Sequence, residues 1–291
     1  MRVVDNFMVA GGSVRGTDHI RKGINNHDAM HVAYDVHTNT LVGVVCDGCG
    51  SGQDSEVGAK VGSMLVATSI FRHLTYSPLD EIWPGVRKEV CSHIHTLSLA
   101  MENGDAIKNV IATNFLFTIV GFVITEERTV VFHIGDGYYA LCRDVVDDDD
   151  GFFEATFEPM EGNYPPYIAY NIVETHVPFL EKDLEFSVVW YPTKTVNGIL
   201  VATDGIERMK VKQNLPVRPG AEESIGLPRQ FLCEDRYVKN SHALQRKLAR
   251  LNPYQPVIFP DWEQNTIHTH LGHLNDDTTV VMARKMVKND E

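Results

Sequence analysis

Five aspartates of this chain stand where apolar, β-rich runs begin or end. Asp28 and Asp276 each precede such a run, whereas Asp47, Asp136 and Asp204 each follow one. In antiparallel sheets the start of one strand lies beside the end of its neighbour, so all five carboxylates can share one rim. Two unit charges ~4 Å apart repel by ~4 kcal/mol at an effective dielectric near 20. The rim therefore needs a cation, and oxygen ligands favour Mg²⁺ or Mn²⁺.

The first two β-rich runs predict a hairpin that pairs two of these acids. Residues 30–36 and 41–46 are rich in β-formers, and the polar stretch between them suits a short hairpin loop. A turn centred in this stretch puts Asp28 opposite Asp47. Like charges placed across a ladder are destabilising unless a cation lies between them.

Most of the remaining strands follow one another without a helical crossover. This order favours an α+β fold with antiparallel sheets over an alternating parallel sheet. Helical spacing of apolar residues predicts helices at 55–75 and 79–101, and two more at about 227–236 and 240–251. The expected strands after the hairpin are 114–125, 129–134, 138–143, 152–157, 184–190, 198–202 and 279–283.

We expect residues 1–291 to form a single domain, since the chain has no internal repeat and no low-complexity linker. Two stretches, 158–182 and 252–275, are expected to be surface excursions, the first because it contains Pro165-Pro166. The acidic run Asp147–Asp150 is interpreted as a solvated hairpin tip.

Composition excludes several partners and compartments. The net charge of −13 disfavours contact with a nucleic-acid backbone or an anionic membrane surface, and no apolar run approaches the ~20 residues of a membrane span. The five cysteines are odd in number and scattered, which favours reduced thiols in the cytoplasm. Cys46 and Cys49 form a C-x-x-C, but no second pair follows at zinc-site spacing.

Taken singly, an Asp-Gly pair is a common turn, but five motifs in order are specific. Together they resemble the motif series of the type 2C, metal-dependent protein serine/threonine phosphatases, in particular their compact bacterial branch. The motifs are Asn26-His27-Asp28-Ala29, Val45-Cys46-Asp47-Gly48-Cys49-Gly50, His133-Ile134-Gly135-Asp136-Gly137, Ala202-Thr203-Asp204-Gly205-Ile206 and Asn275-Asp276-Asp277-Thr278-Thr279.

The resemblance implies a four-layer α-β-β-α sandwich, with two antiparallel sheets flanked by helices and a centre for two Mn²⁺ or Mg²⁺ ions at one end. Asp47 would bridge the ions and Gly48 would lend its carbonyl oxygen. The other ligands implied by motif matching are Asp28, Asp204 and Asp276, with Asp136 at a third, weaker site.

The implied reaction is hydrolysis of phosphoserine and phosphothreonine in proteins. A water held between two divalent ions loses its proton readily and can attack phosphorus in line, without a covalent enzyme intermediate. Asp47 and Asp204 are the implied catalytic acids, and His19 or His27 is a candidate general acid toward the leaving alkoxide. The implied partners are phosphorylated proteins and a cognate Ser/Thr kinase.

The chain departs from the family pattern at the phosphate-binding position. Many members place an arginine five residues before the first motif aspartate, where this chain has Gly23. Arg21 and Lys22 lie close by and are the candidates to contact the substrate phosphate. Gly137 replaces the serine that usually follows the acid of the third motif.

Two alternatives stay open from sequence. His268, His270 and His273 precede the last motif and could hold zinc, although a loop with solvated histidines is favoured. The chain could also be a catalytically weak or inactive phosphatase-like regulator that binds a phosphoprotein or a kinase. Retention of all five acids argues against that role, because an inactive site has no cation to offset the crowded charge.

Overall fold

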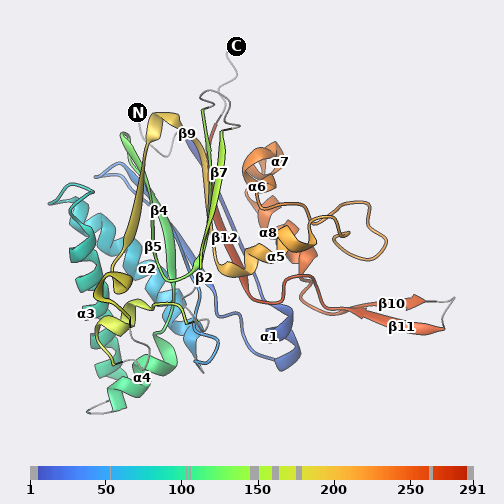
Figure 1. The fold of residues 1–291 in the computed structure, drawn as a ribbon, viewed down its shortest axis with the longest axis horizontal. Coiled ribbons are helices and arrows are strands. Elements are labelled where there is room, and N and C mark those ends of the chain that lie inside the picture. Colours follow the sequence, from blue (N-terminus) through green and yellow to red (C-terminus); the bar gives the residue numbers. More distant parts are fainter. Residues whose placement is uncertain are drawn as a thin grey trace.

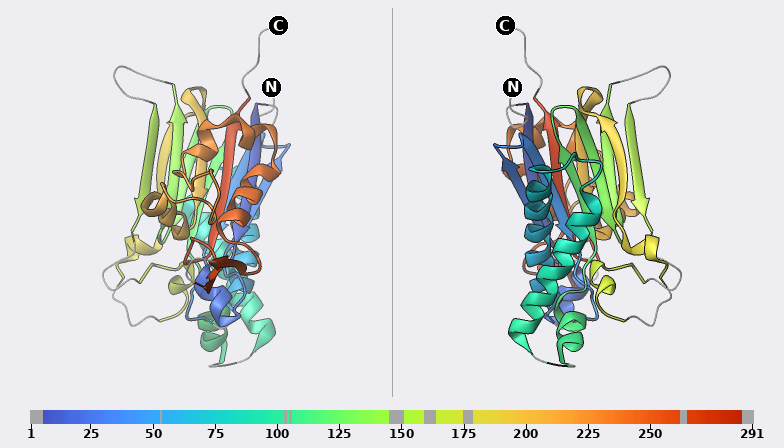
Figure 2. Two further views of the ribbon diagram at one scale, coloured as in Figure 1. Left: turned by 90° about the vertical axis from the view of Figure 1, so that its right-hand side faces the viewer. Right: turned by 90° about the vertical axis from the view of Figure 1, so that its left-hand side faces the viewer.

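Two five-stranded antiparallel sheets pack face to face in the computed structural model, and helices cover both outer faces (Figures 1 and 2). The structure describes residues 6–286 except 53, 103, 105, 145–150, 159–163, 175–178 and 262–264. The acidic run Asp147–Asp150, predicted to be a hairpin tip, lies outside the described residues.

The first sheet has the order β1-β12-β9-β6-β7, so strands from both ends of the chain pair within it. Its strands are β1 (Phe7–Val14), β6 (Gly137–Arg143), β7 (Phe152–Phe157), β9 (Val196–Ala202) and β12 (Thr278–Lys285). The second sheet has the order β2-β3-β4-β5-β8. Its strands are β2 (Ala29–Asp35), β3 (Thr40–Cys46), β4 (Ile119–Ile124), β5 (Arg128–Ile134) and β8 (Ser187–Pro192).

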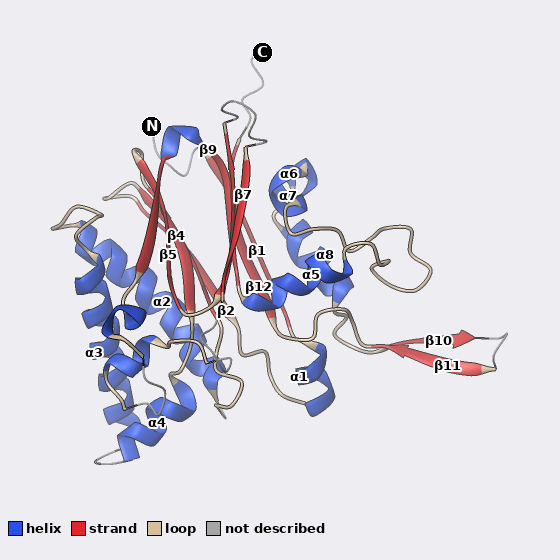
Figure 3. Ribbon diagram, viewed as in Figure 1, coloured by secondary structure: helices blue, strands red, loops and turns tan. Residues whose placement is uncertain are grey.

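Helices α2 and α3 lie on the outer face of the second sheet with α4 beside them, and α5 to α8 lie on the outer face of the first, as the coloured helices and strands show (Figure 3). Their bounds are α2 (Ser55–Leu74), α3 (Trp83–Met101), α4 (Ala106–Asn114), α5 (Glu207–Lys212), α6 (Gln230–Cys233), α7 (Asp235–Lys239) and α8 (His242–Leu251). The predicted α+β sandwich of two antiparallel sheets with flanking helices is confirmed.

Three apolar clusters hold these layers together. One fills the space between the sheets, with Phe122 and Val201 at 0% exposure. A second lies between α2, α3 and the second sheet, and a third lies between the first sheet and α5–α8. Both faces of each sheet are therefore buried, which explains why β3 and β4 read as continuous apolar runs.

The β2–β3 hairpin has the predicted register. Ala29 faces Cys46 at one end and Asp35 faces Thr40 at the turn. Asp28 and Asp47 are therefore the next residues beyond the paired part of the hairpin. The hairpin fixes both acids at the same end of the second sheet.

Some elements differ from the predictions. The second predicted helix begins at Trp83 instead of Leu79, and α4 occupies a stretch before β4 that was assigned no helix. Residues 252–275, expected as a loop, contain a hairpin of β10 (Val257–Asp261) and β11 (Thr266–His270). It projects from the body beside α8 (Figure 1). β1 and the short helix α1 (Thr17–Lys22) were also not predicted.

Short 3₁₀ turns complete the described elements. They are η2 (Ile168–Asn171), η3 (Glu181–Leu184), η4 (Thr193–Thr195) and η5 (Asp204–Ile206). Of these turns, η5 contains one of the five acids, since it begins at Asp204 directly after β9. Across the part of the chain that the structure describes, no helix combines the length and the apolar character needed to span a bilayer.

Candidate active site

Two cavities open at the end of the sheets where β3 and β9 finish. The larger has a volume of about 530 Å³ and the smaller about 410 Å³, and both are lined by Asp136, Asp204 and Asp276. Asp47 lines the smaller cavity. Asp28 is buried close by, since its charge is the largest influence on the Asp47 carboxyl after burial itself. The structure thus brings the five predicted acids to one end of the molecule.

The backbone at the strand ends holds the acids in place. Asp47 follows β3, and its carbonyl oxygen accepts a hydrogen bond from the Thr118 amide at 2.8 Å. Asp136 lies in the tight turn between β5 and β6, flanked by Gly135 with φ 90° and Gly137 with φ 139°. Only glycine adopts such angles without strain. The turn therefore presents the Asp136 side chain at the edge of the sheets.

Gly48 and Gly205 follow two of the acids and are required by close packing. A Cβ atom on Gly48 would lie 2.8 Å from the carbonyl oxygens of His27 and Ser55, and one on Gly205 would lie 2.1 Å from the carbonyl oxygen of Asp277. Any side chain at either position would push these backbone segments apart. The glycines thus allow the strand ends that carry the acids to approach one another.

Burial and mutual repulsion raise the pKa of four of the acids. For Asp28 and Asp47 the pKa lies well above the ordinary range, because of burial first and neighbouring carboxylates second. The same two causes raise the pKa of Asp136 to about 7 and of Asp204 to about 6. A cluster of this kind takes up protons at neutral pH unless a cation compensates its charge.

The donor types fit hard divalent cations. The Oδ1 atoms of Asp28 and Asp204 are buried and have no hydrogen-bond partner among the described residues, and such atoms are costly unless something pairs with them. Within the same part of the chain, no three His, Cys, Asp or Glu side chains already stand in the arrangement of an ion site. The carboxylates thus gather in one region, and two of their buried oxygen atoms lack hydrogen-bond partners among the described residues. They are not already arranged as a chelating set.

Asp277, beside the predicted ligand Asp276, has a different role. Its carboxylate accepts three hydrogen bonds. The donors are the Gly16 amide at 2.7 Å, the His27 amide at 2.5 Å and the Nδ1 atom of His19 at 2.9 Å. Asp277 is 2% exposed, whereas Asp276 is exposed and lines both cavities. Asp277 therefore anchors the segment around α1, and Asp276 is the one of these two acids that faces the cavities.

His19 and His27 lie in contact but face different surroundings. Their ring centroids are 4.6 Å apart. His19 lines both cavities, and its pKa is raised by the hydrogen bond to Asp277 against the opposing effect of burial. His27 is buried, its Nδ1 lies 3.1 Å from Ser55 Oγ, and burial lowers its pKa. Of the two histidines, His19 is the one exposed to the cavities.

The cationic side chains near the acids are only partly those expected. Arg21 donates to Asp18 at 2.8 Å, and it is not part of either cavity wall. Lys22 lines the larger cavity, and so does Arg208 on α5, which sequence reasoning missed. The sequence could have indicated that Arg208 lies near the acids, because it follows Asp204 by four residues, one turn along a helical segment.

Aromatic residues and a thiol also line the smaller cavity. Tyr164, Tyr167 and Tyr170 come from the expected excursion 158–182. Cys49 also lines this cavity, and its Sγ lies 3.1 Å from Ser51 Oγ. Cys46, its partner in the C-x-x-C motif, is buried, and both thiols are free. These side chains and the acids therefore line the same cavity.

The three histidines that precede the last motif do not join the acids. His268 and His270 lie on β11, and the ring of His270 lies 4.7 Å from that of His273. The pKa values of His270 and His273 are lowered by burial first, and Lys212 acts on both in the same direction. An ammonium group this close disfavours a second cation, so the zinc interpretation gains no support.

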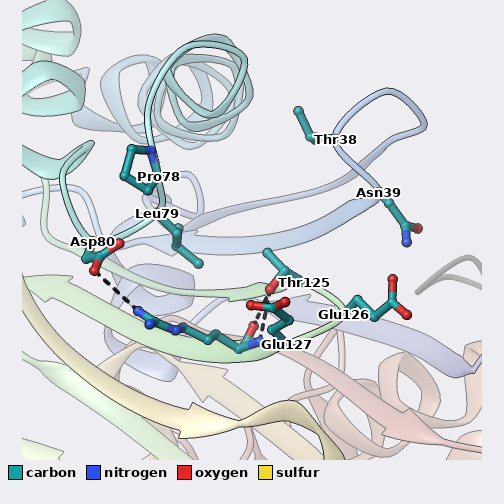
Figure 4. Close-up of a pocket in the computed structure, with 9 residues that line it drawn as sticks. Thr38, Asn39, Pro78, Leu79, Asp80, Thr125, Glu126 and Glu127 are labelled. Atoms are coloured by element: carbon teal, nitrogen blue, oxygen red, sulfur yellow. Dashed lines mark hydrogen bonds and ion pairs between the residues drawn. The ribbon is translucent and has the colours of Figure 1, made fainter.

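A further cavity, of about 390 Å³, lies at the opposite end of the second sheet, between the β2–β3 and β4–β5 turns (Figure 4). Arg128 in its wall forms an ion pair with Asp80 at 3.4 Å, and none of the five clustered aspartates lines it. The clustered aspartates therefore lie only at the other end of the sheets, among the cavities described.

Comparison with known proteins agrees with this architecture. The profile of the protein phosphatase 2C family matches residues 15–238. No curated protein matches the sequence. Solved structures match over almost the whole chain at low identity.

Three of these structures illustrate the likeness. A bacterial serine phosphatase bearing an R161E mutation is 14% identical, with 96% of this chain and 99% of that one covered and a TM-score of 0.52. The serine/threonine phosphatase Stp1 from Staphylococcus aureus is 13% identical, with 96% and 95% covered and a TM-score of 0.51. A C. elegans sex determining protein is 13% identical, with 96% and 65% covered and a TM-score of 0.51. At these identities the likeness concerns the fold.

Proposed function

The chain belongs to the protein phosphatase 2C family, and on this basis we propose that it hydrolyses phosphoserine and phosphothreonine in proteins with the help of divalent metal ions. The observation that carries the proposal is the gathering of five carboxylates at one end of the sheets. Crowded acids with unpaired buried oxygens are unfavourable by themselves, and a bound cation offsets that cost.

The residues that would hold the ions are Asp28, Asp47, Asp204 and Asp276 with the carbonyl oxygen of Gly48, and Asp136 is proposed for a weaker third ion. When bound, two Mn²⁺ or Mg²⁺ ions supply Lewis-acid chemistry, because they lower the pKa of water and offset the charge of a phosphate group. Carboxylate and carbonyl oxygens are the donors that these ions prefer.

We assign proton transfer to His19. Asp277 accepts a hydrogen bond from Nδ1 of this ring, which leaves Nε2 as the atom that can hold a proton toward the cavities. That proton would pass to the alkoxide oxygen of the departing serine or threonine. His27, the second candidate, bonds to Ser55 and lines neither cavity.

We propose phosphoproteins, and a Ser/Thr kinase that forms them, as partners. The five free thiols suit a reducing compartment, so we propose a cytoplasmic location. We also propose that residues 1–291 act as one domain, since β1 and β12, from opposite ends of the sequence, pair within one sheet.

A second candidate function is that of a catalytically weak regulator that binds a phosphoprotein or a kinase. It is favoured by one observation, that the described acids are not already arranged as a chelating set. In that case the protein would bind phosphopeptides and leave them intact.

The test is release of phosphate from a phosphothreonine peptide, measured with Mn²⁺ and again after treatment with a chelator. Turnover that needs Mn²⁺ supports the phosphatase. Peptide binding without turnover at any Mn²⁺ concentration supports the regulator.

A further inference from the structure

The walls of the larger cavity are dominated by negative charge. Its acidic lining residues are Asp18, Asp136, Glu158, Asp204, Glu207 and Asp276. Among the described residues that line the two cavities, only Lys22 and Arg208 carry a permanent positive charge. A phosphate dianion that enters this region therefore has two direct cationic partners besides any bound metal.

Arg208 is held over the cavity by the segment that carries Asp204. The turn η5 runs directly into α5, so residue 208 follows residue 204 by one turn and lies on the same face. The next residue, Met209, is fully buried in the cluster beneath the helix. This packing fixes the orientation of α5 and turns position 208 toward the cavity.

The neighbouring cations are engaged elsewhere, but Arg208 is not. Lys210 forms ion pairs with Glu207 at 3.2 Å and Glu154 at 3.3 Å, and Lys212 donates to the carbonyl oxygen of His273 at 2.5 Å. No hydrogen bond or ion pair to the exposed Arg208 side chain occurs within the described ranges. Its guanidinium group is thus free to bind a ligand.

We propose that Arg208 binds the phosphate group of the substrate, with Lys22 on α1 as its counterpart on the same cavity. This assignment rests on the proposed function. A guanidinium fork matches two phosphate oxygens with two parallel hydrogen bonds, whereas an ammonium acts as a point charge. Arg208 therefore fixes the orientation of the phosphate, and Lys22 adds attraction.

The experiment compares Arg208→Gln, Arg208→Lys and the control Arg246→Gln with the wild type. Arg246 is an exposed arginine on α8 that lines neither cavity, so its substitution changes the net charge equally. For each protein, kcat and KM are measured with a phosphothreonine peptide in Mn²⁺. The binding of inorganic phosphate is measured by calorimetry in the same buffer.

We expect Arg208→Gln to raise KM and the dissociation constant of phosphate about tenfold or more, as for a lost charge-assisted hydrogen bond, with kcat changed less than KM. Arg208→Lys recovers part of the loss, and Arg246→Gln behaves as the wild type. Unchanged KM and phosphate binding in Arg208→Gln would overturn the assignment while leaving the phosphatase intact. If the wild type has no turnover, the proposed function fails, and the calorimetric comparison alone decides the role of Arg208.

Discussion

Asp28 and Asp47 lie directly beyond the last paired residues of the β2–β3 hairpin, where Ala29 faces Cys46. After burial, the charge of Asp28 is the largest cause of the raised pKa of Asp47. Two acids so placed do not both ionise at low cost, and a cation between them removes the conflict. Several measurable consequences follow from this pair and from the acids around it.

Asp47→Asn should stabilise the metal-free protein and abolish its response to metal. Removing one charge of the crowded pair relieves a repulsion of roughly 1 kcal/mol. Thermal unfolding in chelator should therefore occur at a higher temperature than for the wild type. Added Mn²⁺ should raise the unfolding temperature of the wild type and leave that of the variant unchanged.

The control for this comparison is Glu222→Gln, which removes one negative charge from an exposed side chain that lines neither cavity. It should change neither the stability in chelator nor the response to Mn²⁺. If Glu222→Gln and Asp47→Asn behaved alike, the effect would reflect net charge alone.

The stability of the metal-free protein should depend on the protonation of Asp136. Its pKa is about 7 in the folded protein, above the ordinary value of 3.8. Between these values the folded state holds a proton that the unfolded state lacks, so this group makes the protein less stable as the pH rises from about 4 to above 7. Asp136→Asn should therefore be more stable than the wild type at pH 8, by up to about 4 kcal/mol for a pKa raised from 3.8 to about 7.

That advantage should shrink as the pH falls from above 7 to about 4, where the wild-type carboxyl becomes protonated in the unfolded state as well as in the folded one. Urea unfolding of both proteins in chelator, at several pH values between 4.5 and 8, measures the difference directly. Because the buried histidines are common to both proteins, their titration does not contribute to the difference between the two free energies of unfolding. A difference that did not change with pH would contradict the assigned shift.

His19→Gln should separate substrates by their leaving groups. A general acid matters for an alkoxide and little for p-nitrophenolate, which leaves without protonation. We expect kcat to fall about 100-fold for a phosphothreonine peptide and only slightly for p-nitrophenyl phosphate. His27→Gln, which alters the adjacent ring without changing the cavity wall, should lack this selectivity, and equal losses on both substrates would remove His19 from proton transfer.

Gly205→Ala should destabilise the protein by roughly 2 kcal/mol or more, since its Cβ would clash with the carbonyl oxygen of Asp277 at 2.1 Å. Gly50→Ala is the matched variant, because a Cβ at Gly50 meets nothing within 4 Å. Urea unfolding of the two variants should give clearly different midpoints. A tolerated Gly205→Ala would mean that the strand ends are not closely packed there.

The sequence predicted those features that local pattern determines. The register of the β2–β3 hairpin followed from the position of its polar turn, and α2 followed from helical spacing of apolar residues. The five acids could be located because each borders an apolar strand. These strands lie in buried sheets, where a run of apolar residues in the sequence corresponds to a strand in the structure.

Other features depend on contacts that sequence spacing does not reveal. The hairpin β10–β11 contains Pro260 and exposed apolar residues, so its strands lack a clear alternation. Asp277 resembles its neighbour Asp276 in sequence, and only its three donors distinguish it. Arg208 has no motif, and its position on the cavity results from the packing of α5.

The central claim is that aspartates distant in sequence jointly bind a pair of divalent ions. Crystals grown with Mn²⁺ and measured at the manganese absorption edge test it most directly. We predict two strong anomalous peaks beside Asp47, within coordination distance of Asp28, Asp204 and Asp276 oxygens. Anomalous peaks only elsewhere, or none at saturating Mn²⁺, would contradict the claim.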